Sequence, residues 1–391
     1  MELPMYVNAC LMRLEEAGFA CYAVGGCVRD AVLGLMPHDY DLCTSATPQQ
    51  MKDLFSDHSL VCAGEKHGTI GVITENGVVE ITTFRTEGAY ADNRHPSWVE
   101  FVKDIEADLA RRDFTVNAMA YHPRRGLCDP FDGKGDLERR IIRAVGEPSR
   151  RFDEDALRIL RALRFAVRLD FSIEEQTAQA MCEAAPTLAL IARERITEEL
   201  RGILGSVGCA AVWPKFMPVW RQVLPGVKEI EPSIWGAPLD FVLRLVLLCY
   251  RSGSDVTERL CLTKIERRAL NRLLAAIDQP IPTDVIAVRR LAAAHGLEDA
   301  DALLRLWQAL GRDTEAAGSL LCECVERGDC MSVAQLAITG ADLDVPPAQI
   351  GQALRGALDA VVSERVPNER TALISYMKHG KMKYMQKRGG C

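Results

Sequence analysis

The sequence predicts an α+β protein, with a strand-containing N-terminal head and a long all-helical remainder. Strand signals fill the first ~140 of the 391 residues, where short β-branched runs are bounded by Gly, Asn, Asp and Pro. From about Phe152 onward, apolar residues recur at helical spacing, as Leu157, Leu160 and Leu163 do in the first such helix. The two periodicities therefore separate the chain into a mixed head and a helical body.

Four segments of the head predict strands. The run 20–26, "ACYAVGG", is apolar and ends in a glycine pair, and the run 36–44, "MPHDYDLCT", follows after one short helical stretch. The segment 68–84, "GTIGVITENGVVEITTF", consists of two β-rich runs around Asn76-Gly77, which is the strongest short signal for a hairpin. The run 97–102, "SWVEFV", is the fourth candidate strand.

Composition limits the classes of protein to consider. A hydrophobic content of 48% with 26% charged residues is that of an ordinary globular protein. The most apolar stretch, 241–250, is interrupted by Arg244 and is far shorter than the roughly 18 residues that a membrane span needs. The N-terminus lacks a basic region, and the 14 cysteines are scattered without zinc-site spacing. We therefore expect a cytoplasmic protein with reduced thiols and no membrane association.

Two aspartates, Asp39 and Asp41, stand one residue apart in the second predicted strand. Residues i and i+2 of a strand share a face, so the two carboxylates should lie side by side, where each makes the other harder to ionise. Mg²⁺ prefers carboxylate and phosphate oxygens and would offset this repulsion. Glu80 interrupts the apolar run "VVEITTF" and is either a third carboxylate of this site or an ordinary outward-facing strand residue.

The segment 24–30, "VGGCVRD", precedes these aspartates. Glycines directly after a strand let the backbone approach a ligand closely, and the following helix would present its N-terminal amides to an anion. Arg29 lies one turn into that helix. Together with the aspartates ten residues later, the segment predicts a triphosphate cradle that faces a metal site.

Six motifs occur in a characteristic order: "GGCVRD…HDYDLCT", "TTFRTEGAYADNRHP", "RRDFTVNAMAY", "DPFDGKGDL", "RFDEDALRILRALRFAVRLDF" and "RERITEEL". In these motifs the chain resembles the bacterial class II CCA-adding enzymes (tRNA nucleotidyltransferases) and their poly(A) polymerase relatives. The resemblance implies a mixed-sheet nucleotidyltransferase head (1–141), a helical neck that selects the nucleobase (142–205), a helical body (206–280) and a helical tail that binds tRNA (281–391). It also implies template-independent addition of CCA from CTP and ATP, by attack of the tRNA 3′-hydroxyl on the α-phosphate with two Mg²⁺ ions.

The resemblance carries roles to individual residues. Gly26, Arg29 and Arg112 would bind the nucleoside triphosphate, and Asp113 would lie by the ribose 2′-hydroxyl. Asp39 and Asp41 would be the catalytic Mg²⁺ ligands, with Glu80 as a third catalytic carboxylate. The residues of the helical neck that would contact the nucleotide are Glu154, Asp155, Arg158, Arg161 and Arg164.

Asp155 and Arg158 are spaced i, i+3, which predicts that both side chains project from one helical face. Cytosine and adenine each carry an amino donor beside a ring-nitrogen acceptor, and an Asp beside an Arg offers the complementary acceptor and donor. Uracil and guanine would place a carbonyl oxygen against the carboxylate. Glu154 would position Arg158 through an i, i+4 contact, although such charges near a helix start also form ordinary ion pairs.

Alternatives stay open at this point. Arg161 and Arg164 either contact the nucleotide or form salt bridges with the segment "RERITEEL", which should pack against their helix. The segment 85–100 looks full length, whereas CC-adding members of the family typically have it shortened, so complete CCA addition is favoured over A-only addition. The rival functions are an A-adding enzyme, a poly(A) polymerase, a transferase acting on a small molecule and a non-catalytic RNA-binding protein. The chain could be a monomer or a homodimer.

Overall fold

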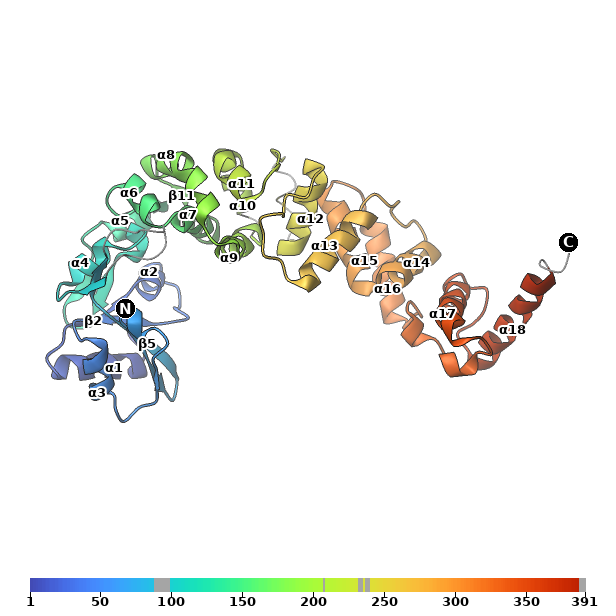
Figure 1. The fold of residues 1–391 in the computed structure, drawn as a ribbon, viewed down its shortest axis with the longest axis horizontal. Helices are drawn as coiled ribbons and strands as arrows, with labels where there is room; N and C mark the ends of the chain where they lie inside the picture. Colours follow the sequence, from blue (N-terminus) through green and yellow to red (C-terminus); the bar gives the residue numbers. More distant parts are fainter. Residues whose placement is uncertain (88–98, 207, 231–234, 236–239, 387–391) are drawn as a thin grey trace. The chain divides into compact units, whose positions relative to one another are not determined.

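The structure, a computed structural model, forms two compact units. It describes the chain except for residues 88–98, 207, 231–234, 236–239 and 387–391. The first unit comprises Met1–Glu229 with Val256–Cys261, and the second comprises Ile230–Asp255 with Leu262–Cys391. The predicted α+β class is confirmed, because a mixed sheet occupies the head and helices make up most of the rest (Figure 1).

The head contains both helices and strands. In chain order its elements are α1 (Met5–Glu16), β1 (Cys21–Val24), α2 (Gly26–Val32), β2 (Asp41–Thr44), α3 (Pro48–Leu54), β3 (Leu60–Val61), η1 (Glu65–His67), β4 (Thr69–Thr74), β5 (Gly77–Thr83), β6 (Arg85–Glu87), β7 (Val99–Phe101), α4 (Ile105–Ala110), η2 (Thr115–Asn117), β8 (Ala120–His122), β9 (Gly126–Cys128), α5 (Gly133–Arg139) and β10 (Ile141–Ile142).

The main sheet of the head has the strand order β3-β4-β5-β2-β1-β8-β9. The β2–β5 pair is parallel and the other neighbouring pairs are antiparallel, so the sheet is mixed. The predicted hairpin is confirmed as β4–β5, in which Gly77 pairs with Thr74 and the connection is Glu75 and Asn76. The neighbouring strands β2 and β5 carry Asp41 and Glu80, which are two of the candidate site residues.

The two faces of this sheet are covered differently. On one face the side chains of Ala23, Leu42 and Ile81 are fully buried, where α1 contacts β1 and α3 contacts β4. On the other face Leu109 of α4 packs with Cys43 of β2 in the core of the head. Because α4 covers the Cys43 end of β2, the Asp41 end of the same face stays open to solvent.

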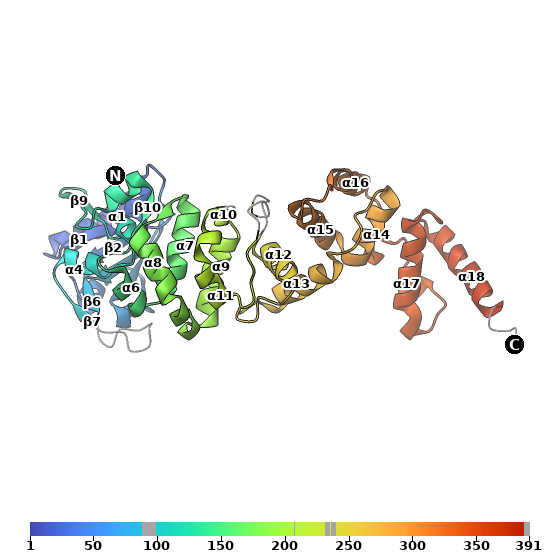
Figure 2. The ribbon, with the colours of Figure 1, turned by 90° about the horizontal axis from the view of Figure 1, so that it is seen from above.

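Helices follow the head within the first unit. They are α6 (Pro148–Glu154), α7 (Leu157–Leu169), α8 (Glu175–Ala184), η3 (Ala185–Leu190), α9 (Arg193–Leu204), α10 (Cys209–Val212), η4 (Pro214–Phe216) and α11 (Met217–Val223). The strand signals did not reveal β11 (Ser172–Ile173), which pairs with β10 over two residues only. The predicted packing of the "RERITEEL" helix against the "EDALR" helix is confirmed, because α9 lies along α7 (Figure 2).

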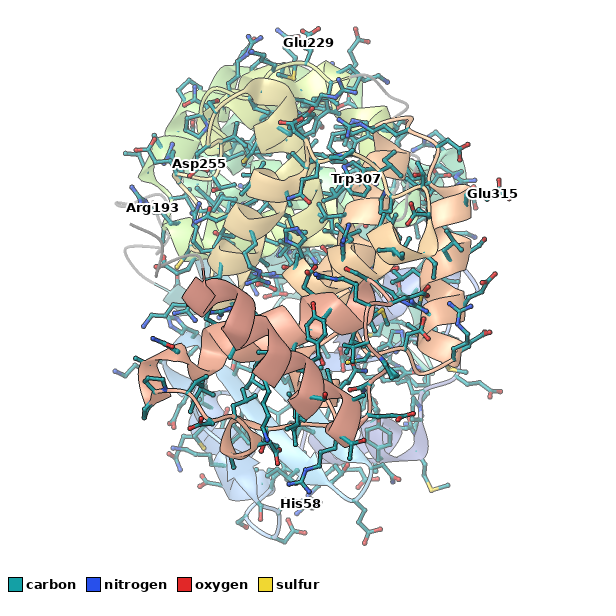
Figure 3. All side chains as sticks on the ribbon, turned by 90° about the vertical axis from the view of Figure 1, so that its right-hand side faces the viewer. His58, Arg193, Glu229, Asp255, Trp307 and Glu315 are labelled. Atoms are coloured by element: carbon teal, nitrogen blue, oxygen red, sulfur yellow. The ribbon has the colours of Figure 1, made fainter. Side chains whose placement is uncertain are left out.

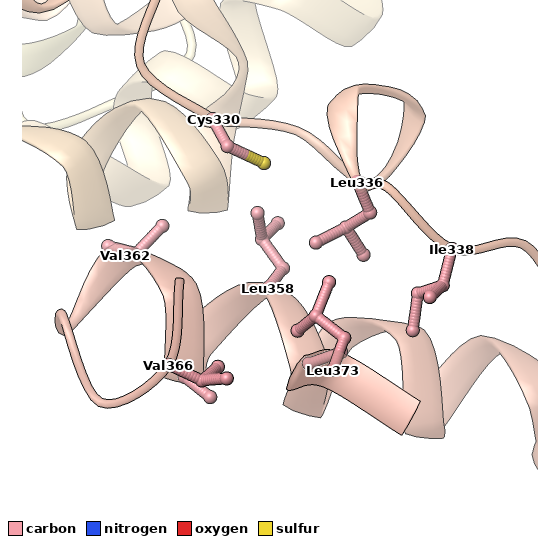
Figure 4. Packing of buried hydrophobic residues seen from close by; sticks show 9 residues of the cluster. Cys330, Leu336, Ile338, Leu358, Val362, Val366 and Leu373 are labelled. Atoms are coloured by element: carbon pink, nitrogen blue, oxygen red, sulfur yellow. The ribbon is translucent and has the colours of Figure 1, made fainter. Parts of the chain in front are cut away.

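The regular secondary structure that is described in the second unit is entirely helical. Its elements are α12 (Phe241–Ser252), α13 (Lys264–Ala276), α14 (Val285–His295), α15 (Leu297–Ala309), α16 (Glu315–Glu326), η6 (Val333–Gln335), η7 (Gly340–Asp342), α17 (Pro347–Val362) and α18 (Arg370–Gln386). Trp307 is fully buried and its indole Nε1 donates to the carbonyl of Ile277 at 2.7 Å (Figure 3). A separate apolar cluster around Leu336, Leu358 and Leu373 joins α17 to α18 (Figure 4).

Two further predictions bear on the class of protein. In the described part of the chain no helix combines the length and the apolar content that crossing a bilayer requires. Each cysteine with a described position is free of disulfide bonds. The division of the helical region into neck, body and tail stays a prediction.

Candidate active site

The predicted glycine turn lies where β1 passes into α2. Gly25 has a φ of +74°, in the region that favours glycine, and its N–H donates to the carbonyl of Met119 at 3.3 Å. A Cβ atom at Gly25 would lie only 3.0 Å from Nη1 of Arg112. The turn therefore needs glycine both for its conformation and to admit the Arg112 guanidinium, and it brings two predicted nucleotide-binding segments together.

Arg29 is held firmly in α2. Its Nη2 lies 2.7 Å from Asp30 Oδ1, its Nη1 donates to Asn117 Oδ1 at 2.8 Å, and the residue is only 7% exposed. Arg29 thus follows the glycine turn in α2, and its guanidinium is already bound by two protein side chains. A ligand would meet a fixed positive charge at this point rather than a mobile side chain.

The two aspartates do not both lie in a strand. The prediction that Asp39 and Asp41 share one strand is wrong, because β2 begins at Asp41 and Asp39 lies in the irregular segment before it. The reason is the neighbouring strand: Val24, the last residue of β1, pairs with Asp41, and Gly25 then turns away into α2. Asp39 has no backbone partner on that side, although it still raises the pKa of the Asp41 carboxyl.

Glu80 lies directly beside Asp41. The two residues are in register in the parallel β2–β5 pair, so their side chains emerge from the same face, and both are exposed. The protein around Asp41 partly desolvates its carboxyl, and this effect, followed by the repulsion of Glu80, raises the Asp41 pKa even though Arg112 opposes the shift. Glu80 is thus an outward-facing strand residue and also a neighbour of the candidate metal ligand.

The carboxylates fit a divalent cation as an incomplete set of ligands. Desolvation by the surrounding protein is the main cause of the raised Asp41 pKa, and the repulsion of Glu80 adds to it; a bound cation would offset that repulsion. Among the residues that the structure describes, no three His, Cys, Asp or Glu side chains lie close enough to hold a metal ion by themselves. Mg²⁺ usually keeps waters and substrate phosphates in its coordination sphere, so a site of this kind would be completed by its substrate.

Arg112 and Asp113 lie just after α4 and face different partners. Nη2 of Arg112 is 3.2 Å from Asp108 Oδ2, while its buried Nε has no hydrogen-bond partner among the residues that the structure describes. Asp113 accepts from Nη2 of Arg161 at 2.7 Å and from the N–H of Phe114 at 2.9 Å. Burial alone would raise the pKa of Asp113, but the Arg161 guanidinium holds it below its ordinary value.

The segment "EDALR" is interrupted rather than continuous. α6 ends at Glu154, Asp155 is extended with φ −148° and ψ 104°, and α7 begins at Leu157. The prediction that Asp155 and Arg158 project from one helical face is therefore wrong. The physical reason is that Asp155 serves as a cap, since its Oδ1 accepts from the N–H of Leu157 at 3.0 Å.

The predicted contact between Glu154 and Arg158 is confirmed. Nη1 of Arg158 lies 2.6 Å from Glu154 Oε2 and also donates to the carbonyl of Arg151 at 3.1 Å. Nη2 donates to the carbonyl of Arg111 at 3.3 Å, which joins the helical neck to the head. Because the side chain is also largely buried, the Arg158 guanidinium has little freedom to turn.

Arg195 is a residue of the site that the sequence analysis missed. Its Nη2 lies 2.7 Å from Asp155 Oδ2, and its Nη1 is 3.4 Å from Oδ1 of the same carboxylate. Arg195 belongs to the "RERITEEL" motif, which was predicted only to pack against α7. Spacing along the chain cannot reveal a pair that lies 40 residues apart.

For the arginines of α7, the salt-bridge alternative is confirmed for Arg164 only, and a contact with the nucleotide stays a prediction for both. Arg164 pairs with Glu199 of α9 at 2.6 Å, as the salt-bridge alternative predicts, whereas Arg161 pairs with Asp113 of the head. Both guanidinium groups, with that of Arg29, also surround the Phe165 ring, at 5.1 to 5.6 Å from its centre. Three cations therefore gather where α7 meets the head.

The buried Asp113 carboxylate predicts a loss of stability in acid. Since its folded pKa is lowered, the unfolded chain binds more protons between the two pKa values. Its contribution is complete above about pH 4 and is lost as the pH falls through the folded pKa. The Tm difference between the wild type and Asp113→Asn should therefore be largest near neutral pH and should shrink below about pH 4, measured by scanning fluorimetry from pH 3 to 7. An equal difference at pH 3 and pH 7 would contradict this assignment.

Comparisons with known proteins agree with this geometry. Residues 21–143 match the poly(A) polymerase head domain, and residues 170–211 match a domain described as a probable RNA and SrmB-binding site of polymerase A. The chain is 35% identical to a CCA-adding enzyme of Lactobacillus delbrueckii subsp. bulgaricus, over 94% of this chain and 96% of that protein. A CCA-adding enzyme of Lactiplantibacillus plantarum is also 35% identical, over 93% of each chain.

Solved structures give the same result. The crystal structure of the Bacillus stearothermophilus CCA-adding enzyme in complex with CTP superimposes with a TM-score of 0.84 at 30% identity, covering 99% of this chain and 100% of that one. A Thermotoga maritima CCA-adding enzyme complexed with tRNA shares the fold, with a TM-score of 0.70 at 21% identity, over 97% of this chain and 96% of that one.

Proposed function

This chain belongs to the family of CCA-adding enzymes, and we propose that it adds CCA to the 3′ end of tRNA from CTP and ATP, without a nucleic-acid template. The observation that carries the proposal is the open end of β2. There Asp41 and Glu80 lie in register on one sheet face, and Arg112 fits against the glycine turn beside them. Carboxylates for a cation and guanidinium groups for phosphates thus meet at one place.

Asp39 and Asp41 are the proposed ligands of two Mg²⁺ ions, with Glu80 beside them. When bound, such ions supply an acidified 3′-hydroxyl and a stabilised pyrophosphate leaving group. The exposed carboxylates of Asp41 and Glu80 leave room for substrate oxygens to complete the coordination. The reaction is attack of the tRNA 3′-hydroxyl on the α-phosphate of the nucleotide, with release of pyrophosphate.

The triphosphate is proposed to bind along the glycine turn. Gly26 opens α2 there, and Arg29 supplies a charge fixed by Asp30 and Asn117. The buried Nε of Arg112 donates to no acceptor among the described residues. A phosphate oxygen of the nucleotide could accept this hydrogen bond. An unpaired buried donor of this kind supports a ligand at this position.

Asp113 is the proposed ribose contact. Its carboxylate is held below its ordinary pKa by Arg161, so it stays a hydrogen-bond acceptor at neutral pH. A ribose 2′-hydroxyl could donate to it, which would favour ribonucleotides over deoxyribonucleotides. Arg161 would act here by orienting Asp113, in addition to lying near the nucleotide.

Asp155 and Arg158 are the proposed readers of the nucleobase, although they do not share a helical face. Each is oriented by an outer partner, Asp155 by Arg195 and Arg158 by Glu154. A carboxylate acceptor and a guanidinium donor fixed in this way could match the amino group and ring nitrogen of cytosine and of adenine. Arg164, paired with Glu199, lies six residues after Arg158 in α7 and is proposed to contact the nucleotide as well.

The test is a primer-extension assay at single-nucleotide resolution with Mg²⁺. A tRNA ending at the discriminator base should gain three residues when CTP and ATP are both present, and then stop. Failure on that tRNA, combined with addition of one A to a CC-ended tRNA, would identify an A-adding enzyme. A long A ladder would identify a poly(A) polymerase. The segment 88–98, on which the choice between CCA and A-only addition partly rests, lies outside the described residues.

The affinity for tRNA should depend strongly on salt, despite the formal net charge of −7. Helices of the second unit carry clustered basic residues, such as Lys264 and Arg268 on α13, both exposed. If two or more phosphates are neutralised, the Kd should rise about tenfold or more between about 50 and 200 mM KCl. Fluorescence anisotropy with labelled tRNA measures this, and a flat response would exclude phosphate-dominated binding.

A further inference from the structure

Asp108 is a carboxylate of the head to which no role has been given above. It lies in α4, directly beneath β2, and is 0% exposed. Burial alone would raise its pKa, but Arg111 and Arg112 together hold the pKa below its ordinary value. Asp108 is therefore a buried negative charge at neutral pH, and its contacts show where that charge acts.

Each contact of Asp108 leads to a different part of the candidate site. Oδ2 lies 3.2 Å from Nη2 of Arg112 and accepts from the thiol of Cys43 at 3.6 Å, two residues beyond Asp41 in β2. Oδ1 lies 2.9 Å from Arg111 and accepts from the backbone N–H of Arg85, the first residue of β6, at 3.3 Å. One carboxylate thus joins the catalytic strand, the nucleotide-binding segment and the start of β6.

The position of Arg112 depends on this carboxylate. Among the described residues, Asp108 is the one salt-bridge partner of Arg112, and Arg112 Nη1 lies against Gly25. Without the charge of Asp108, no other salt bridge among the described residues would hold the guanidinium against the glycine turn. The attraction of Asp41, a proposed ligand of the cation, would then draw the guanidinium away from the turn.

We propose that Asp108 is a positioning residue for nucleotide binding, which acts by fixing the Arg112 guanidinium against the glycine turn. The inference rests on the proposed role of Arg112 in binding the triphosphate. Asp108 itself is buried and touches no substrate. Its removal should therefore weaken the binding of CTP and ATP alike, because it acts on the shared triphosphate and not on the base.

The first test compares Asp108→Asn with a matched control, Asp136→Asn. Asp136 is also fully buried, and it pairs with Arg139 at 2.7 Å and Arg143 at 3.2 Å, neither of which is a proposed nucleotide contact. Both variants should lose thermal stability, because each removes a buried carboxylate charge that two arginines contact. Asp108→Asn should also raise KM for CTP and for ATP about tenfold each, with a smaller change in kcat, whereas Asp136→Asn should leave both KM values within about twofold.

A double-mutant cycle separates positioning from a merely structural effect. Arg112→Ala should raise KM, and adding Asp108→Asn should raise it no further, since the residue that Asp108 positions is already gone. If Asp108→Asn raises KM equally in both backgrounds, or leaves KM unchanged in the wild type, the inference is overturned. If Arg112→Ala alone leaves KM unchanged, the proposed role of Arg112 fails instead.

If Asp108→Asn does not fold, the inference is tested with Asp108→Glu, a variant that retains the negative charge. Asp108→Glu keeps the negative charge but displaces the carboxylate by one methylene, which alters its contact with Arg112, so it should raise KM by less than Asp108→Asn. Equal KM values for Asp108→Glu and the wild type, in a folded variant that has lost the Arg112 contact, would also overturn the inference. The nucleotides used throughout are CTP and ATP with a saturating tRNA primer.

Discussion

Replacing Asp41 with asparagine should lower the single-turnover rate of nucleotide addition on the order of a thousandfold or more, while the Kd for tRNA stays within about twofold. Asparagine keeps the shape of the side chain and one oxygen but removes the charge. The Asp41 carboxylate lies beside Glu80 at the open end of β2, where burial, followed by the repulsion of Glu80, raises its pKa, and a cation bound there would favour the charged form. Loss of the charge should therefore remove metal-assisted catalysis without disturbing the fold.

The control for this prediction is an aspartate outside the site. Asp57 pairs with Arg13 at 2.8 Å and has no contact with the proposed catalytic residues, so Asp57→Asn should keep the wild-type rate. Asp39→Ala should fall in the same class as Asp41→Asn, with turnover abolished and tRNA binding retained. An Asp41→Asn enzyme that keeps more than a tenth of the wild-type rate would exclude Asp41 as a metal ligand. A wild-type chain that binds tRNA without any turnover would favour the non-catalytic RNA-binding alternative.

Arg158→Ala should relax the choice of nucleobase. The ratio of kcat/KM for CTP over UTP, and for ATP over GTP, should fall by about ten- to a hundredfold, the size expected when a hydrogen bond to a charged group is lost. Arg158 is fixed by Glu154 at 2.6 Å and by two backbone carbonyls, and in its proposed role a guanidinium held in this way would reject a base whose donors and acceptors are reversed. Steady-state kinetics with the four nucleotides separately measure the two ratios.

Two further variants make this prediction specific. Arg195→Lys keeps the positive charge near Asp155 but loses the two-nitrogen contact, so discrimination should fall in part. Arg168 lies on the same helix α7 and is exposed, so Arg168→Ala should leave both ratios unchanged. If Arg158→Ala lowers kcat/KM for all four nucleotides by the same factor, Arg158 supports the fold or the phosphates and does not read the base.

Local patterns were sufficient to predict several parts of the structure. The strand-glycine-helix passage at Gly25, the β4–β5 hairpin and the Glu154–Arg158 contact each depend on residues within a few positions of one another. Glu80 was singled out because a charge interrupts an apolar strand run, and the parallel pairing of β2 with β5 then placed it beside Asp41. The turn, the hairpin, the Glu154–Arg158 contact and the choice of Glu80 as a candidate can therefore be predicted from the periodicity and spacing of nearby residues.

Other parts depend on tertiary pairing and could not be predicted from spacing. The end of α6 at Glu154 has no Gly or Pro to signal it, and Asp155 leaves the helical conformation because its carboxylate caps α7 and pairs with Arg195. The start of β2 is set by where β1 ends, which displaced Asp39 from the strand. No sequence pattern singles out Asp108 as a buried residue, since a single aspartate in a short helix is usually exposed.

The central claim is that one protein site selects C, C and then A without a template. It is tested most directly by incubating a tRNA that ends at the discriminator base with equal concentrations of ATP, CTP, GTP and UTP, and then sequencing the 3′ ends. If the protein has the proposed activity, nearly all extended tRNA molecules should end in CCA, with few additions of G or U and no extension beyond the A. Mixed ends that follow nucleotide concentration, or A tracts of varied length, would contradict it.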